Sequence, residues 1–331
     1  MKRLLWLLPC LLIALLIPFL LGGSDMWQRL ASFPSQLLLA MLGMILLCWL
    51  LNAMRLRLLL AERARQLGRI KSIGVVMATE FAICATPGGT GGPLTLMALL
   101  ARNGIRPARS SALFAIDQLN DLLFFFCAFA GILLYGLFHR LTPNLENMLG
   151  LSAVLLLAGF AAIIALARYH RALIRGSGHL LARLKVRRAR RIHLARKLLH
   201  FRDALRDSLN LPRRRLALIF LLTSAHWGLR FSVLYLALYG LGADIQWAWT
   251  FLIQMLALSA GQLSLLPGGV GGTELTSAAL LAPLVGKSTA AAAILIWRAI
   301  TYYFYLLAGG PAFLLLAGRP FLRRLMRLRG G

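Results

Sequence analysis

Six charged side chains lie inside long apolar segments of this sequence, and they are the residues best placed to do chemistry. They are Glu80, Asp117, Asp121, Glu274, Arg230 and Arg298. The acids are four of only ten Asp and Glu in 331 residues. A charge in hydrocarbon costs at least ~2.5 kcal/mol on insertion scales, so it faces an opposite charge or a polar cavity. The acids could form such a polar cavity or relay protons, and the arginines could bind an anionic substrate such as a lipid phosphate.

Two glycine turns interrupt the apolar segments in the same way. PGGTGGP occupies residues 87–93 and PGGVGGT occupies residues 267–273. Glycine permits positive φ and close backbone approach, and proline removes an N–H that lipid could not satisfy. A helix starting after each turn would point its N-terminus into the membrane, towards an anion. We therefore predict a substrate-binding role for Arg230 and Arg298 together with eight glycines: Gly88, Gly89, Gly91, Gly92, Gly268, Gly269, Gly271 and Gly272.

The composition identifies an integral membrane protein, with 60% hydrophobic and only 14% charged residues. Apolar blocks of the length that crosses a bilayer cover residues 4–22, 36–53, 113–138, 149–167, 216–241 and 290–317. The first block follows Lys2 and Arg3, as in a signal peptide, but no convincing small-x-small cleavage site follows it, so we interpret it as a retained helix. We predict an all-α multi-pass fold with about six spanning helices, forming a single transmembrane domain over residues 1–331.

The positions of the basic residues predict the topology. The net charge is +27, and with a cytoplasmic N-terminus 32 of the 37 Lys and Arg fall on the cytoplasmic side. The segment 168–215 is a basic cytoplasmic segment, and its charge favours binding to anionic lipid headgroups over nucleic acid. We expect a bacterial inner-membrane protein with both termini in the cytoplasm.

The glycine turns then belong to re-entrant hairpins. Residues 72–101 have cytoplasmic flanks and residues 247–285 have outer flanks, so each segment should dip in and return. An offset of 180 superimposes the two turns and also brings Gln118 onto Arg298. We predict inverted repeats, residues 36–138 and 216–317, an architecture found in many transporters. The alternative is that the glycines only allow helices to pack closely.

These motifs resemble a known family. TPGGTGGP, RNGIRPARSSALFAIDQLNDLL, LPGGVGGTE and AAAILIWRAITYY are similar to the flippase-like transmembrane region of lysylphosphatidylglycerol synthases and its stand-alone relatives, over about residues 37–310. The resemblance implies a protein that moves or handles lipids, with landmarks at residues 87–92, 117–121, 267–274 and 298. Gly92-Pro93-Leu94 and Asp117-Gln118 depart from the common family pattern and leave the lipid open. No aminoacyl-transferring domain is recognised, so lipid lysylation by this chain alone is not expected.

The function expected from these features is movement of an anionic phospholipid or polyprenyl-phosphate-type lipid between leaflets by alternating access. The expected partners are that lipid and anionic headgroups, with no nucleic acid; a homo-oligomer is compatible with the sequence. Two alternatives stay open: a lipid-modifying enzyme using Glu80, Asp117 and Asp121, and a secondary carrier for a soluble anion. No phosphate loop, Gly-x-Ser-x-Gly or HExxH motif occurs, so we expect no catalytic residue, metal or cofactor.

The topology makes a first prediction. Single cysteines at Gly331 and within 168–215 should react with impermeant reagents only from the cytoplasm, whereas cysteines at Asp25, Glu146 and Lys287 should react from outside. Labelling of positions 287 and 331 from the same side would contradict the inverted repeat.

Overall fold

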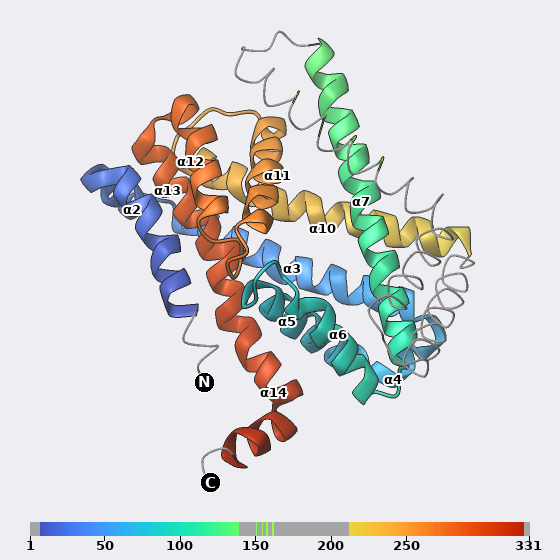
Figure 1. The fold of residues 1–331 in the computed structure, drawn as a ribbon. Helices are drawn as coiled ribbons and strands as arrows, with labels where there is room; N and C mark the ends of the chain where they lie inside the picture. Colours follow the sequence, from blue (N-terminus) through green and yellow to red (C-terminus); the bar gives the residue numbers. More distant parts are fainter. Residues whose placement is uncertain are drawn as a thin grey trace, which may run out of the picture. The chain divides into compact units, whose positions relative to one another are not determined.

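A computed structural model describes residues 7–138 and 212–327, together with the isolated positions 150, 154, 157 and 161. These residues form helices joined by turns, so the predicted all-α class is confirmed (Figure 1). The chain divides into two compact units, Met1–Ser110 with Arg213–Gly331, and Ser111–Pro212. The apolar block 149–167, apart from four positions, and the basic segment up to residue 211 lie outside the described residues.

Four helical stretches in the described part of the chain are long and apolar enough to cross a membrane. They are Ser35–Leu67, Pro107–Tyr135, Arg213–Gly240 and Lys287–Ala317, and they coincide with four of the six predicted blocks. The first block lies in helix α2 (Leu7–Ala31), which kinks at Gly23, where φ is 60° and ψ is −157°. The described part before the kink, residues 7–22, is shorter than the ~20 residues that a straight spanning helix needs.

The long helices have simple boundaries. Helix α3 (Ser35–Leu60) continues through η1 (Ala61–Arg63) into α4 (Ala64–Leu67), and α7 covers Pro107–Phe138. Helix α10 covers Arg213–Gly240. The last stretch contains α13 (Lys287–Arg298), a π-helical segment η2 (Ala299–Tyr303) and α14 (Phe304–Arg327).

Two helical hairpins lie between these long elements. The first consists of α5 (Arg69–Cys84) and α6 (Gly91–Arg102), and the second of α11 (Trp247–Leu263) and α12 (Gly272–Val285). With 16, 12, 17 and 14 residues, the four helices are ~18 to ~26 Å long and fall short of ~30 Å of hydrocarbon. The re-entrant hairpins expected at residues 72–101 and 247–285, and their depth in a membrane, stay a prediction.

The two hairpins lie end to end, with their tips facing one another (Figure 1). An isolated antiparallel backbone bridge joins Pro87 in the first tip to Pro267 in the second. The repeated sequence therefore brings its two copies into direct contact, although they are 180 residues apart.

The two tips also share a backbone conformation. In each, the second glycine donates its N–H to the residue before the proline, and the next residue donates to the proline carbonyl. These bonds are Gly89 to Thr86 (3.1 Å), Thr90 to Pro87 (3.3 Å), Gly269 to Leu266 (3.0 Å) and Val270 to Pro267 (3.4 Å). The paired glycines have φ of 57° and 68° in the first tip and 65° and 67° in the second. Glycine is the residue that adopts this region without strain, which explains the motif.

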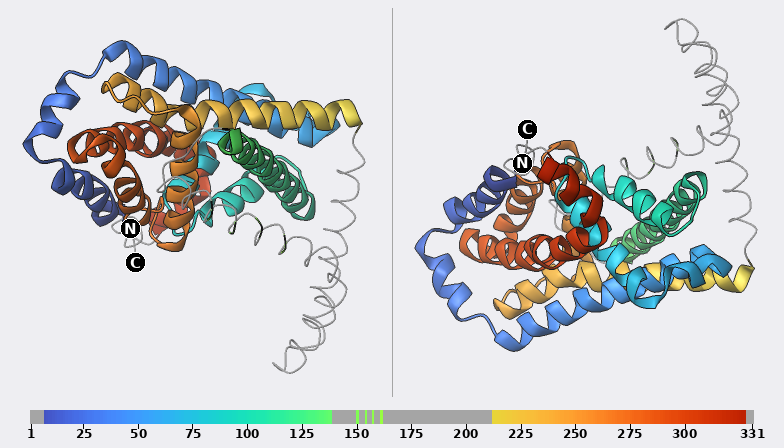
Figure 2. Two further views of the ribbon diagram at one scale, coloured as in Figure 1. Left: turned by 90° about the horizontal axis from the view of Figure 1, so that it is seen from above. Right: turned by 90° about the horizontal axis from the view of Figure 1, so that it is seen from below.

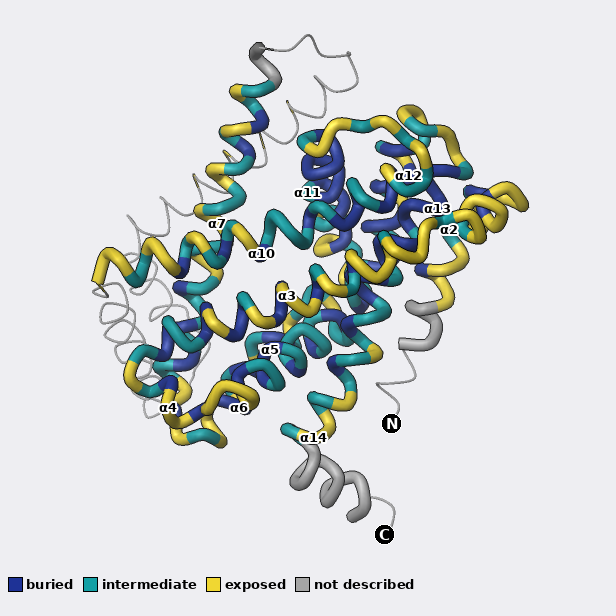
Figure 3. Tube along the Cα trace, turned by 180° about the vertical axis from the view of Figure 1, so that it is seen from behind, coloured by how far each residue is buried: buried dark blue, intermediate teal, exposed yellow. Residues whose placement is uncertain are grey.

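Close helix packing surrounds the hairpins. Helices α3 and α10 run side by side (Figure 2), and Arg55 on α3 donates a 3.1 Å hydrogen bond to the Thr223 hydroxyl on α10. Helix α13 carries a run of fully buried alanines, residues 290–293, of which Ala291 and Ala292 cluster with Met26 of α2. A Cβ at Gly22 would lie 2.7 Å from that of Ala291, so small residues allow these helices to approach closely. Figure 3 shows how α11 and α13 are buried along most of their length.

Helix α14 holds the first hairpin along its length. A Cβ at Gly309 would lie 2.8 Å from the carbonyl oxygen of Met77 on α5, so the two backbones are close. At the far end of α6, Arg102 donates to the carbonyl oxygens of Leu316 (2.6 Å) and Ala317 (3.3 Å). Residue 320 is a proline, which has no N–H to donate to the Leu316 carbonyl. Arg102 supplies the missing donor and joins hairpin and helix.

The equivalent glycines of the two tips allow a matched test. A Cβ at Gly268 would clash with the Tyr302 ring, whereas a Cβ at Gly88 would have no neighbour within 4 Å. We expect Gly88→Ala to lose only the backbone preference, about 1–2 kcal/mol. Gly268→Ala should lose about 1–3 kcal/mol more, because the ring must move. Thermal unfolding of the purified variants in detergent measures both; equal losses would contradict a role for the ring contact.

Candidate functional site

Each hairpin carries one acidic side chain that is paired with an arginine. Glu80 on α5 lies 3.6 Å from Arg230 on α10, measured from Oε2 to Nη1. Glu274 on α12 lies 2.6 Å from Arg298 on α13, measured from Oε1 to Nε. Four of the six charges singled out in the sequence therefore form two ion pairs, as the cost of an isolated charge in an apolar interior requires.

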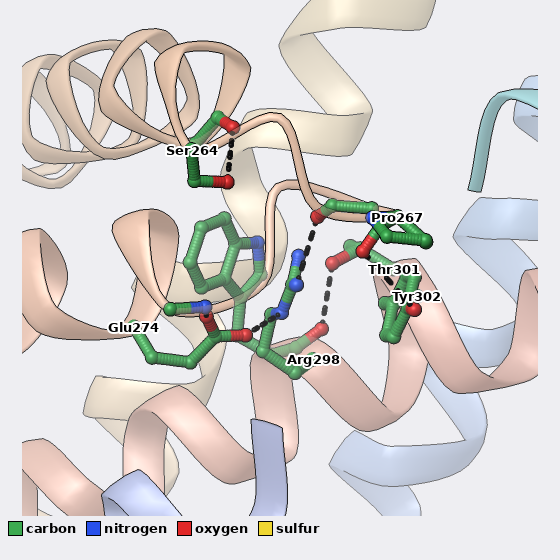
Figure 4. A network of polar contacts seen from close by, with 10 residues as sticks. Ser264, Pro267, Glu274, Arg298, Thr301 and Tyr302 are labelled. Atoms are coloured by element: carbon green, nitrogen blue, oxygen red, sulfur yellow. Dashed lines mark hydrogen bonds and ion pairs between the residues drawn. The ribbon is translucent and has the colours of Figure 1, made fainter. Parts of the chain in front are cut away.

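The Glu274–Arg298 pair fastens the second tip (Figure 4). The Gly271 N–H donates to Glu274 Oε2 at 2.7 Å, and Arg298 Nη2 donates to the Gly268 carbonyl oxygen at 2.9 Å. The guanidinium lies over the Tyr302 ring, 4.4 Å from its centroid. Only 4% of the Arg298 side chain and 0% of the Glu274 side chain are exposed. This pair is closed to solvent, and both of its members hold backbone of the same turn.

The helix N-termini are less open than the sequence led us to expect. Glu274 occupies the N-terminus of α12, so the protein supplies its own anion there. In the first tip, the Gly91 N–H donates to the Thr86 hydroxyl at 2.8 Å, and the Gly92 N–H donates to the Gly89 carbonyl at 3.1 Å. Capping within the turns therefore satisfies the N–H groups of Gly91, Gly92 and Gly271. Substrate binding by the eight glycines stays a prediction, and it would require these bonds to exchange.

The Glu80–Arg230 pair is assembled from four elements. Arg230 Nη1 donates to the Tyr305 hydroxyl of α14 at 3.3 Å, and the guanidinium lies 4.8 Å from the centroid of that ring. Trp227, one turn earlier on α10, contributes a second aromatic face at 5.6 Å. Asn52 of α3 donates from Nδ2 to Glu80 Oε1 at 3.4 Å. The Arg230 and Glu80 side chains keep 17% and 14% exposure, so this pair is more accessible than the other.

Unsatisfied polar atoms lie close to this second pair. Trp49 Nε1, Asn52 Oδ1 and His226 Nδ1 are buried and have no hydrogen-bond partner within residues 7–138 and 212–327. Trp49 packs against Tyr305 with ring centroids 5.3 Å apart. The His226 carbonyl accepts a 3.5 Å hydrogen bond from Cys48 Sγ, joining α10 to α3. The pair therefore sits in a polar cluster inside an apolar bundle, with spare donors and acceptors.

Sequence reasoning missed the neutral members of this cluster. Asn52, Trp49 and Tyr305 carry no charge and belong to no repeated motif. Asn52 alone left a usable signal, because an amide inside the apolar block 36–53 must find a partner.

The two remaining predicted acids belong to the other compact unit of the chain. Asp117 and Asp121 lie on α7, in the part of that helix that belongs to the second compact unit. Their predicted role in a polar cavity stays a prediction.

The repeat conserves the turn but not the charges. At the offset of 180, Leu94 stands where Glu274 stands, and Gln118 stands where Arg298 stands. Helix α6 has no acid in its first turn, and Leu94 is 64% exposed. The acid of the first hairpin is Glu80, on the helix before the turn. The ion pair of the second hairpin therefore holds its turn, whereas the ion pair of the first hairpin joins helix α5 to α10.

The buried pair makes a stability prediction. Arg298→Gln leaves the Glu274 carboxylate buried without its cation, and should cost about 3–5 kcal/mol of folding free energy. The double change Arg298→Gln with Glu274→Gln should cost less than Arg298→Gln alone, because no buried charge is left. Unfolding in detergent gives the coupling, and Arg29→Gln, at an exposed arginine on α2, should stay within about 0.5 kcal/mol of the wild type. Additive losses in the double variant would show that the two side chains are not coupled.

Comparison with known proteins agrees with this architecture. Residues 6–309 match the family described as the lysylphosphatidylglycerol synthase TM region. A UPF0104 membrane protein of Archaeoglobus fulgidus is 22% identical over 265 residues, covering 77% of this chain and 79% of that protein. A UPF0104 membrane protein of Pyrococcus horikoshii is 31% identical over 99 residues, 30% of each chain. The chain is thus a multi-pass membrane protein, and it belongs to the lysylphosphatidylglycerol synthase transmembrane-region family.

Proposed function

We propose that this protein moves an anionic lipid, of the phospholipid or polyprenyl-phosphate type, between the leaflets of a bacterial inner membrane, with both termini cytoplasmic. The observation that carries the proposal is the meeting of two short hairpins, tip to tip, at Pro87 and Pro267. Broken helices that meet inside inverted repeats form the substrate sites of many transporters. The family membership is compatible with a lipid substrate, since the family name refers to lipid synthases.

The headgroup is the part of the lipid that needs the protein. A phosphate cannot enter ~30 Å of hydrocarbon without a compensating charge, whereas the acyl or prenyl tails can stay in the bilayer. Arg230 is the better cation for this role, because 17% of its side chain is exposed against 4% for Arg298. A guanidinium binds phosphate oxygens in a bidentate manner, and the Tyr305 and Trp227 faces orient it.

The anchoring of the hairpins favours a rocking movement. The first hairpin packs on α3 and α14, and the second packs on α10, α13 and α2. At the tips, a single isolated bridge connects them. A separation of the tips could therefore occur while the packing of α3 against α10 is kept, so that only the hairpins change their relative position. Alternating access needs this kind of separation between two internally rigid halves.

The alternatives predict different products. A lipid-modifying enzyme would change the mass of the lipid, and a carrier for a soluble anion would accumulate that anion inside vesicles. A flippase changes only the leaflet in which the lipid is found.

The test is lipid translocation in reconstituted vesicles. Proteoliposomes carrying a trace of fluorescent phosphatidylglycerol, and in a second set fluorescent polyprenyl phosphate, are treated with an impermeant quencher. We expect faster transfer than in protein-free vesicles for at least one of these lipids, with its mass unchanged. Arg230→Gln should reduce the rate by about tenfold or more, as expected for loss of a charge-assisted hydrogen bond worth about 1.5–3 kcal/mol. Arg230→Lys should retain part of the rate, because the charge stays but the planar fork is lost.

Arg214→Gln is the matched control, because Arg214 lies on the same helix and is exposed. It should transfer lipid at the wild-type rate when the amounts of reconstituted protein are equal. Full activity of well-folded Arg230→Gln would remove this arginine from the site. Absence of transfer of either lipid by the wild-type protein would count against the proposed function.

A further inference from the structure

We propose that binding of an anionic headgroup at Arg230 is coupled to protonation of Glu80, so that lipid and proton travel together. This inference rests on the proposed function and adds the coupling ion. It comes from the difference between the two ion pairs and from one buried amide oxygen beside Glu80.

The two pairs differ in how firmly they are closed. Glu274 and Arg298 approach to 2.6 Å, are shielded from solvent, and each bind turn backbone as well. Glu80 and Arg230 are 3.6 Å apart and partly exposed, and among the described residues their hydrogen bonds go to Asn52 and Tyr305 on helices and not to a tip. Exchange of the partner is therefore far easier at Arg230 than at Arg298.

Arg230 needs one anion at all times. Its other contacts, the Tyr305 hydroxyl and the two aromatic faces, orient the guanidinium but bring no full negative charge. In an apolar interior an uncompensated guanidinium is costly, so Glu80 can leave only when another anion replaces it. A lipid phosphate is such an anion.

Glu80, once released from Arg230, would be an unpaired carboxylate in an apolar interior, which is also costly. Uptake of one proton by its carboxylate oxygen removes the charge and creates an O–H donor. The ion balance is then complete: before binding, Arg230 is neutralised by the Glu80 carboxylate, and afterwards by the phosphate, while Glu80 is a neutral acid. The net charge of the cluster stays the same, and the proton comes from the aqueous side that delivers the lipid.

The side chain of Asn52 can form hydrogen bonds with both the ionised and the protonated form of Glu80. Its Nδ2 group donates to the carboxylate at 3.4 Å, as the charged form requires. Its Oδ1 atom is buried, with the residue 8% exposed, and lacks a hydrogen-bond partner in the described part of the chain. A protonated Glu80 can donate to this oxygen while accepting from Nδ2, since an amide and a carboxylic acid complement one another. The Oδ1 atom of Asn52 lacks a donor because Glu80 carries no proton while it is paired with Arg230.

The other ionisable groups around the pair come from every packed element. They are Cys84 on α5, Cys48 on α3, His226 on α10 and Tyr305 on α14, with Arg55 of α3 acting on His226 and Arg298 of α13 acting on Cys84. None of these four is a second carboxylate, so Glu80 is the group among them whose negative charge a lipid phosphate can replace at Arg230. Because the anion and the proton enter and leave together, a proton gradient would drive the lipid in the direction of proton flow.

The experiment measures proton uptake on lipid binding. Purified protein in detergent is titrated with short-chain phosphatidylglycerol in buffers of different ionisation enthalpy, and in a parallel arm with inorganic phosphate. Calorimetry then gives the number of protons bound per ligand. We expect uptake of about one proton per lipid and an affinity that falls by up to about tenfold per pH unit as the pH rises. In Glu80→Gln, binding should continue with no uptake and no such pH dependence, because the amide resembles the protonated acid.

The controls separate the outcomes. Glu62→Gln, at an exposed acid in η1, should keep the wild-type proton uptake. Response to inorganic phosphate alone would assign the site to a soluble anion and overturn the lipid assignment. Lipid binding by the wild-type protein without proton uptake would overturn the coupling and leave the proposed function intact, even if Glu80→Gln did not fold. Absence of binding to either ligand would count against the Arg230 site itself, and the coupling would fall with it.

Discussion

The cost of an unpaired charge in an apolar interior is the constraint on which this structure depends. Both hairpins end in turns whose backbone cannot form regular helix bonds, and each hairpin carries an acid near its turn. Arg298 meets the carboxylate of Glu274 and the carbonyl of Gly268, so one side chain satisfies both the charge and the turn of the second hairpin. Arg230 meets Glu80 and fixes the first hairpin to α10. Without these pairs, the short hairpins would bury charges for which the apolar bundle offers no substitute.

The internal repeat explains the shape of the tips but not their function. The first two glycines of each turn take similar positive φ and the same turn bonds, because a residue without a Cβ adopts this backbone region without strain. The third glycines differ, since Gly271 has a φ of 82° and Gly91 does not have a positive φ. The charges do not follow the repeat: Leu94 replaces Glu274, and the acid of the first hairpin lies on α5 instead. The two similar hairpins therefore differ in their ion pairs. The second turn is fastened by the buried Glu274–Arg298 pair, and the first hairpin is paired with the more exposed Arg230. This difference between the two hairpins agrees with the proposed function, in which the second hairpin is structural and the first lies at the substrate site.

One continuous stretch of helix contacts both hairpins. Arg298 and Tyr302 reach the second tip, and Tyr305, just beyond the π-helical segment, reaches Arg230 beside the first. A π-helical turn rotates the residues that follow it relative to an α-helix, and such turns are frequent at functional sites. Here it lets residues close in sequence serve two separate ion pairs. Movement of either hairpin would therefore act on the same segment, which gives the proposed rocking a physical connection between the two halves.

The sequence by itself determined the all-α class, four of the spanning stretches, the places of the hairpins and the family, because these follow from local hydrophobicity, chain length and glycine motifs. It also identified Glu80, Arg230, Glu274 and Arg298, since a charge in an apolar block is conspicuous in any sequence. Only the tertiary structure decided which acid meets which arginine, since both partners lie far apart along the chain and several pairings were equally neutral. The meeting of Pro87 with Pro267 and the recruitment of Asn52 and Tyr305 were likewise decided there. Neutral polar residues acquire a role from what packs against them, and that information resides in the three-dimensional arrangement of the helices.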